Sequence, residues 1–140
     1  MRHAATPSRL ALAALLALGL AGCGGNRYPV EGKVVWTDGT EASDLAGGTV
    51  VFESADGTTS ANGEIREDGS FRMHTLKPGD GVAPGEYRVV VTPPPAPKPD
   101  RFPPPVLDPR FSRLGKSGLS CTVRPERNEG VVFKVARAGR

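Results

Sequence analysis

The sequence Pro84-Gly85-Glu86-Tyr87-Arg88-Val89-Val90-Val91-Thr92 carries the clearest structural signal in this chain. Its large apolar side chains recur at every second position, at Tyr87, Val89 and Val91, while Glu86 and Arg88 occupy the opposite side. This is the period of a β-strand that buries one face. The Pro-Gly pair in front of it is typical of a turn. We therefore predict a strand over residues 86–92.

Six further runs show the same alternation, and turn residues separate them. They cover Tyr28–Trp36, Thr49–Ser54, Ser60–Arg66, Ser70–Thr75, Gly118–Val123 and Gly130–Ala136. No helical period is sustained over three turns. Short strands at intervals of roughly ten residues indicate an all-β fold, a single antiparallel β-sandwich of about seven strands. The inward phase holds Val30, Val34, Trp36, Val50, Phe52, Phe71, Met73, Val131, Phe133 and Val135.

A proline-rich stretch interrupts the strands at residues 93–105, where eight of thirteen residues are proline. Proline cannot donate to a β-ladder, so we expect an extended connection over the surface. A role as a Pro-x-x-Pro ligand is the alternative. Residues 107–114 after it are expected to form a turn or a short helical piece. The predicted sandwich domain spans residues 28–137.

The N-terminus has a different character. Arg2 and Arg9 precede an apolar run, Leu10–Leu20, which is too short to span a bilayer that needs roughly twenty residues. Small residues then lead to Cys23, as in a secretory signal segment. Leu20-Ala21-Gly22-Cys23 resembles the lipobox of bacterial lipoproteins.

That resemblance implies that residues 1–22 are a signal peptide cleaved between Gly22 and Cys23, and that Cys23 receives a diacylglycerol. Further acylation of its amine is implied too, and two or three chains anchor a protein firmly. Residues 23–27 then form a lipidated tether that keeps the domain close to the membrane. Gly24, rather than Asp, follows the cysteine. By the sorting rule of Gram-negative bacteria this favours the outer membrane, on its periplasmic or surface face.

The charge balance argues against nucleic acid as a partner. Removing the signal segment takes away Arg2 and Arg9, so 18 basic residues fall to 16, against 15 acidic ones. The charges are interspersed, without a basic block or an aromatic ladder. We therefore expect lipid, envelope proteins or glycans as partners, and no nucleic acid.

Cys121 has no intramolecular partner if Cys23 is lipidated. Alternation places its side chain on the same face as Leu119 and Val123. We expect a buried, inert thiol, with a reactive or intermolecular cysteine as the alternative.

The order of these segments resembles a family of short lipoproteins of planctomycete bacteria, usually described as carboxypeptidase-regulatory-like or transthyretin-like domains. The matching segments are YPVEGKV at 28–34, GGTVVF at 47–52, DGSF at 68–71, KPGDG at 77–81, PGEYRV at 84–89, LDPRF at 107–111 and SGL at 117–119. The resemblance covers nearly all of the chain after Cys23. It implies a fold and brings no catalytic residue, because fold alone does not carry an activity.

Catalytic and metal sites find little support. The chain after Cys23 has one histidine, His74, on a predicted outward face, and no nucleophile elbow. Zinc needs several His or Cys ligands, and the scattered Asp-Gly pairs are turn chemistry rather than a calcium loop. We expect no cofactor, no metal site and no enzyme. The histidine-rich hydroxyisourate hydrolases of transthyretin-like fold are a poor match for the same reason.

A Lys–Asn cross-link, as in adhesin domains of similar architecture, would use Lys33, Asn128 and Glu86. Alternation places Lys33 and Glu86 on charged faces, where surface ion pairs explain them more simply. We expect a non-enzymatic structural or protein-interaction module. The alternative is a glycan- or ligand-binding module, for which only Phe102 and Phe111 are expected to be exposed aromatic residues.

Overall fold

The computed structural model describes residues 26–98 and 103–139. They form seven strands: β1 (Val30–Trp36), β2 (Thr49–Ser54), β3 (Ser60–Glu64), β4 (Ser70–Arg72), β5 (Gly85–Thr92), β6 (Leu119–Val123) and β7 (Asn128–Val135). Two short 3-10 helices, η1 (Ser43–Leu45) and η2 (Pro109–Ser112), accompany them. The predicted signal peptide, with Gly22 and Cys23, lies outside the described residues.

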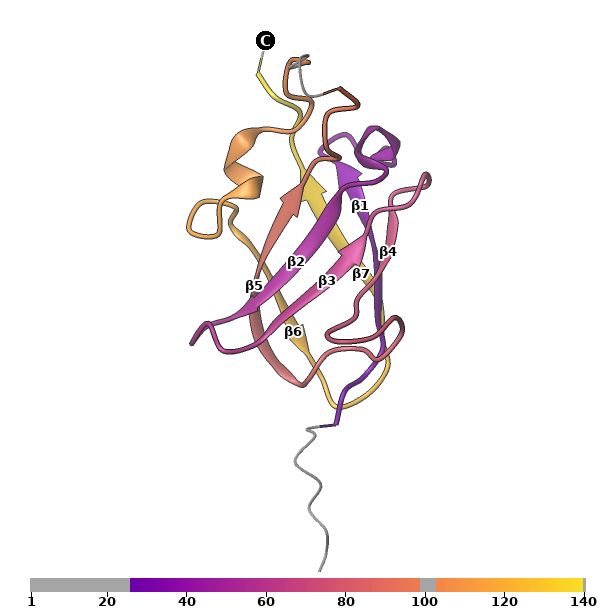
Figure 1. The fold of residues 1–140 in the computed structure, drawn as a ribbon, viewed down its shortest axis with the longest axis vertical. Coiled ribbons are helices and arrows are strands. Elements are labelled where there is room, and N and C mark those ends of the chain that lie inside the picture. Colours follow the sequence, from indigo (N-terminus) through magenta and orange to yellow (C-terminus); the bar gives the residue numbers. More distant parts are fainter. Residues whose placement is uncertain (1–25, 99–102, 140) are drawn as a thin grey trace, which may run out of the picture.

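Two sheets face each other across the core (Figure 1). One has the strand order β4-β1-β7 and the other the order β3-β2-β5-β6. Every predicted strand is present, and β2 has the predicted bounds. Strands β3 and β4 end earlier than predicted because the chain leaves the sheet for a turn. The prediction of an all-β, sandwich-like fold is confirmed.

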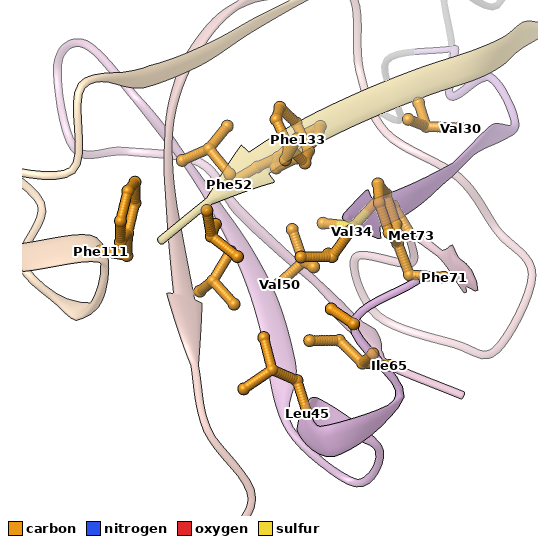
Figure 2. Close-up of a cluster of buried hydrophobic side chains, with 14 of the residues drawn as sticks. Val30, Val34, Leu45, Val50, Phe52, Ile65, Phe71, Met73, Phe111 and Phe133 are labelled. Carbon is orange, nitrogen blue, oxygen red and sulfur yellow. The ribbon is translucent and has the colours of Figure 1, made fainter. Parts of the chain in front are cut away.

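The core holds the side chains that the alternation placed inward. Phe71 and Phe133 stack with ring centroids 5.7 Å apart, and Phe52 from the facing sheet meets Phe133 edge-on at 5.9 Å. Figure 2 shows these rings among the aliphatic side chains of both sheets. Among the predicted inward residues of the strands, Leu119, Cys121 and Val131 are only half-buried.

One strand pair contradicts the prediction of a purely antiparallel sandwich. Strands β1 and β7 run parallel, while the other strand pairs are antiparallel. Alternation reveals which side chains point inward but carries no information on strand direction. Direction follows from the connections, and here a short turn carries the chain from β6 in one sheet to β7 in the other.

A bulge interrupts the β1–β7 ladder where it begins. Val30 lies opposite Asn128 but Gly32 lies opposite Val131, so β7 contains an extra residue. Gly130, in the bulge, has a φ of +71°, which suits glycine. Across the ladder, a Cβ on Gly32 would lie 2.1 Å from the carbonyl oxygen of Val131. The absence of a side chain at Gly32 is therefore a condition for this pairing.

The two flanks of the sandwich are closed differently. On one flank, Asn62 and His74 exchange backbone hydrogen bonds of 2.8 Å, which link β3 to the chain after β4. On the other flank, no pairing joins β6 to β7 among the described residues. Residues 106–118, which we call the strap, cross the upper part of this flank (Figure 1).

The strap is fastened by hydroxyl groups and by apolar side chains. Ser112 Oγ donates to the Val91 carbonyl at 2.8 Å, and Ser117 Oγ donates to the Val89 carbonyl at 2.5 Å. Phe111 is only 4% exposed and belongs to the core, so the prediction that it is exposed is wrong. The reason is local, because the Asp108 carboxylate caps the turn and η2 directs Phe111 inward. Phe102 lies outside the described residues.

The close approach at Gly32 generates a stability prediction. Gly32→Ala should lower the free energy of unfolding by about 1–3 kcal/mol, because the new methyl group must displace β7 or the Phe71 ring. Urea unfolding measures this loss. Gly115→Ala is the matched control, since a Cβ there meets no atom within 4 Å. Equal unfolding midpoints for the two variants would contradict the constraint.

Candidate functional site

The outer face of the three-stranded sheet carries a hollow. It is a shallow groove of about 600 Å³, which we call the outer groove. Its lining comes from β1, β4 and β7 and from the turns beside them. Ladder register sets Lys33 beside Ser70 on one side and beside Val132 on the other. The pleat of the sheet therefore determines which side chains line this surface.

Two outward-facing valines, Val35 of β1 and Val132 of β7, line the outer groove. Val35 is half-buried and Val132 is 54% exposed, which makes Val132 one of three large, exposed apolar side chains in the described part of the chain. The other two, Leu76 and Val106, lie outside this groove. Val35 and Val132 together provide the apolar part of this surface.

Ion pairs lie beside these valines, on β1 and β4. Lys33 Nζ lies 2.6 Å from Glu41, whose hydrogen bond raises the pKa of Lys33. Arg72 Nε donates to Glu31 at 2.7 Å, and this contact lowers the pKa of Glu31. Arg127 lies 3.7 Å from Glu31. Because opposite charges neutralise one another here, the groove has no strong field of one sign.

These contacts answer the question of the Lys–Asn cross-link. Lys33 lies opposite Val132 rather than Asn128. The Asn128 amide instead donates to the carbonyl groups of Arg124 and Glu126, at 3.1 and 2.6 Å. Glu86 lies in β5, in the other sheet. The structure does not bring the three residues together, and the alternative explanation by surface ion pairs is confirmed for Lys33.

No catalytic arrangement is found in the described part of the chain. The His74 ring forms no hydrogen bond with another described residue, while its backbone pairs with Asn62. A triad needs a base that contacts both a nucleophile and an orienting acid. Among residues 26–98 and 103–139, no group of three or more His, Cys, Asp or Glu side chains could hold a metal ion.

Cys121 is half-buried and packs against the core, and it forms no disulfide with another described residue. Burial raises the pKa of its thiol, which disfavours the reactive thiolate. Cys121 is therefore only partly buried, whereas a buried thiol was predicted. The predicted lipidation at Cys23 and cleavage after Gly22 fall outside the described residues.

The proline-rich stretch lies on the surface, as predicted, in its described portions. Residues 93–97 and 103–106 line a second, mainly proline-walled groove of about 270 Å³. It lies at the end of the molecule opposite the start of β1 (Figure 1).

The guanidinium group of Arg137 lies over the Trp36 ring, with its central carbon 4.3 Å from the ring centroid, near the far end of β1.

The end of the sandwich at which the chain enters is built around Asp80, which sequence analysis treated only as part of a turn. We call the segments 26–29, 75–84 and 124–128 the entry end. The Asp80 carboxylate accepts the backbone N–H groups of Thr75, Leu76 and Lys77 at 2.7, 2.9 and 3.0 Å. Arg27 lies 3.2 Å from the same carboxylate. Asp80 therefore ties loop 75–81 to the first described residues.

Searches of protein-family models, curated proteins and solved structures found no match to this chain. The geometry of the chain itself therefore carries the functional argument. Within the described ranges, no helix has the length and apolar character that crossing a membrane requires.

Asp80 generates a pH prediction. Burial acts to raise the pKa of Asp80, but the three N–H groups and Arg27 outweigh it and lower that pKa from 3.8 to about 2. The stabilisation from Asp80 is therefore present at neutral pH and is lost as the pH falls from about 4 through about 2. Asp80→Asn should lower the free energy of unfolding at pH 7 by about 1–3 kcal/mol. The difference in the free energy of unfolding between Asp80→Asn and the unmodified chain should become smaller below pH 4.

Urea unfolding between pH 7 and pH 2 measures this gap. Asp44→Asn is the control, because Asp44 accepts no backbone N–H group from another residue and only lies 3.8 Å from Arg137. A gap for Asp80→Asn that stays constant down to pH 2 would contradict the assignment.

Proposed function

We propose that this chain is an exported bacterial lipoprotein, anchored through acylated Cys23, whose sandwich is a non-enzymatic protein-interaction module of the cell envelope. The outer groove is the proposed binding surface. The observation that carries the proposal is the composition of that groove, in which Val35 and the exposed Val132 lie beside charges that already pair with one another.

This combination of apolar and polar groups is typical of protein–protein interfaces, which contain both apolar area and polar, solvent-accessible groups. Lys33 and Arg72 are already paired with Glu41 and Glu31, so these charges are balanced without a ligand. A strongly charged ligand gains little at such a surface, whereas a partner protein can bury the valine.

A glycan-binding role, the alternative, has less support. Glycans and small ligands are commonly held by stacking on aromatic rings, and the large rings here belong to the core. The core rings are Trp36, Phe52, Phe71, Tyr87, Phe111 and Phe133. Tyr28 is half-buried, and no aromatic side chain among the described residues is exposed. A protein partner is therefore the better proposal.

The family assignment and the location belong to the same proposal. The seven-strand architecture is compatible with a transthyretin-like or carboxypeptidase-regulatory-like domain. The lipobox-like Leu20–Cys23 stretch supports cleavage of residues 1–22 and attachment to a bacterial membrane, with the outer membrane as the proposed site. On this proposal, the sandwich extends over residues 28–137.

The anchor is tested by the intact mass of the protein isolated from envelope membranes. We expect the mass of residues 23–140 plus two or three acyl chains, and recovery in the membrane fraction. Cys23→Ser should give an unacylated protein. Cys121→Ser is the matched control and should retain the acyl mass. An unmodified mass in a soluble fraction, for the chain with Cys23 intact, would overturn the anchor.

The binding surface is tested by a photo-cross-linking amino acid placed at Val132 in the producing cells. We expect a discrete adduct with an envelope protein from position 132. Position 122 is the control, because Thr122 is also exposed but lies in the other sheet. Excess purified Cys23→Ser protein should compete the adduct away, and the same protein carrying Val132→Arg should not.

Two results would count against the outer groove. One is equal cross-linking from positions 132 and 122, which indicates crowding rather than binding. The other is equal competition by the competitor proteins with and without Val132→Arg, which indicates that the partner binds elsewhere.

A further inference from the structure

Leu76 is the most exposed of the three large, exposed apolar side chains in the described part of the chain. It is 74% exposed, and it lies in loop 75–81 of the entry end. This exposure is imposed by the loop. The N–H groups of Leu76 and of both its neighbours, Thr75 and Lys77, all donate to the Asp80 carboxylate. Three bonds to one carboxylate hold the backbone, so Leu76 cannot turn toward the core.

The loop is also fixed to the place where the chain enters the fold. Asp80 Oδ2 accepts the N–H of Leu76 at 2.9 Å and lies 3.2 Å from Arg27 Nη1. Tyr28 and Val82 exchange backbone hydrogen bonds of 2.9 Å. A Cβ on Gly81 would lie 2.3 Å from the Tyr28 carbonyl oxygen, so the loop is pressed against the entering chain. Loop and entering chain therefore move as one unit.

The chain before Arg27 limits how far this unit can stand from the proposed anchor. Four residue steps separate Cys23 from Arg27. A fully extended chain spans at most about 3.6 Å per residue, so Cys23 and Arg27 are at most roughly 14 Å apart. An acylated Cys23 lies at the boundary between acyl chains and headgroups. The entry end must then stay within reach of the headgroup region.

We propose that loop 75–81 docks on the phospholipid bilayer, with Leu76 inserted at the interface and the Lys77 ammonium group among the headgroup phosphates. This inference rests on the proposed lipid anchor and adds an orientation to it. Lys77 is exposed and has no ion-pair partner among the described residues. An apolar side chain beside a lysine suits an anionic lipid surface. The membrane, in this proposal, covers the exposed leucine.

The proposed orientation has a consequence for the other surfaces. The proline-walled groove lies at the opposite end of the molecule, away from the bilayer (Figure 1). The outer groove lies along the length of the sandwich, on the outer face of β4-β1-β7. It therefore stays open to proteins that stand beside this one on the same membrane.

The test uses the full lipidated chain in vesicles of phosphatidylethanolamine and phosphatidylglycerol. An environment-sensitive fluorophore is attached at Leu76→Cys in a Cys121→Ser background, and Val106→Cys is the matched control. Val106 is also a large, exposed apolar residue, 43% exposed, but it lines the opposite groove. Circular dichroism verifies that both labelled proteins are folded, and co-sedimentation verifies that both bind vesicles.

We expect blue-shifted emission at position 76, strong quenching by nitroxide-labelled lipids and weak quenching by iodide. The fluorophore at position 106 should show no blue shift, weak quenching by nitroxide-labelled lipids and strong quenching by iodide. If the protein binds vesicles but the fluorophores at both positions are equally accessible to iodide, the docking is overturned and the anchor stays intact. Loss of co-sedimentation would overturn the anchor and the docking together. Protection of position 76 in isolated envelopes but not in pure lipid vesicles would show that a protein covers Leu76, and would also overturn the docking.

Discussion

The contact of Phe133 with two other rings joins the halves of this molecule. Its ring stacks on Phe71 within its own sheet and meets Phe52 of the facing sheet edge-on. No disulfide links the sheets among the described residues, so the apolar core holds them together. Strand β7 must lie close to β1 for this contact to form, and a bare Gly32 permits that approach. Packing at one ring thus depends on the absence of a side chain on the neighbouring strand.

The same pairing builds the proposed binding surface. Because β7 adds to β1 in a fixed register, its inward residue Phe133 and its outward residue Val132 are placed by one ladder. The register of the β1–β7 ladder therefore shapes both the core and the outer groove. Asp80 has a comparable role at the entry end, where its carboxylate holds the loop that presents Leu76 and also binds Arg27. Both proposed binding surfaces therefore follow from contacts that also hold the fold together.

Much of the fold could be predicted from the alternation of residues, and the candidate site could not. The pattern identified the inward faces of six strands but assigned none to β3, and the predicted inward residues Leu119, Cys121 and Val131 are only half-buried. It did not reveal that Lys33 faces Val132, because register between distant strands depends on the chain's connections. Phe111 was misplaced because its burial follows from a capped turn fastened to β5, which is a tertiary contact. Asp80 looked like ordinary turn chemistry, and its four contacts emerge only when the loop closes on Arg27.

Local chemistry is what the residue order could specify without a structure. Period-two alternation set strand faces, glycine pairs marked turns, and proline excluded residues 93–105 from a sheet. The lipobox-like stretch ending at Cys23 likewise depends on neighbouring residues alone. The parallel direction of β7, the strap over the open flank and the grouping of side chains into the outer groove required the folded chain. The reason is physical: alternation is a property of one strand, whereas direction, register and shared surfaces are properties of strands far apart in sequence that meet only in three dimensions.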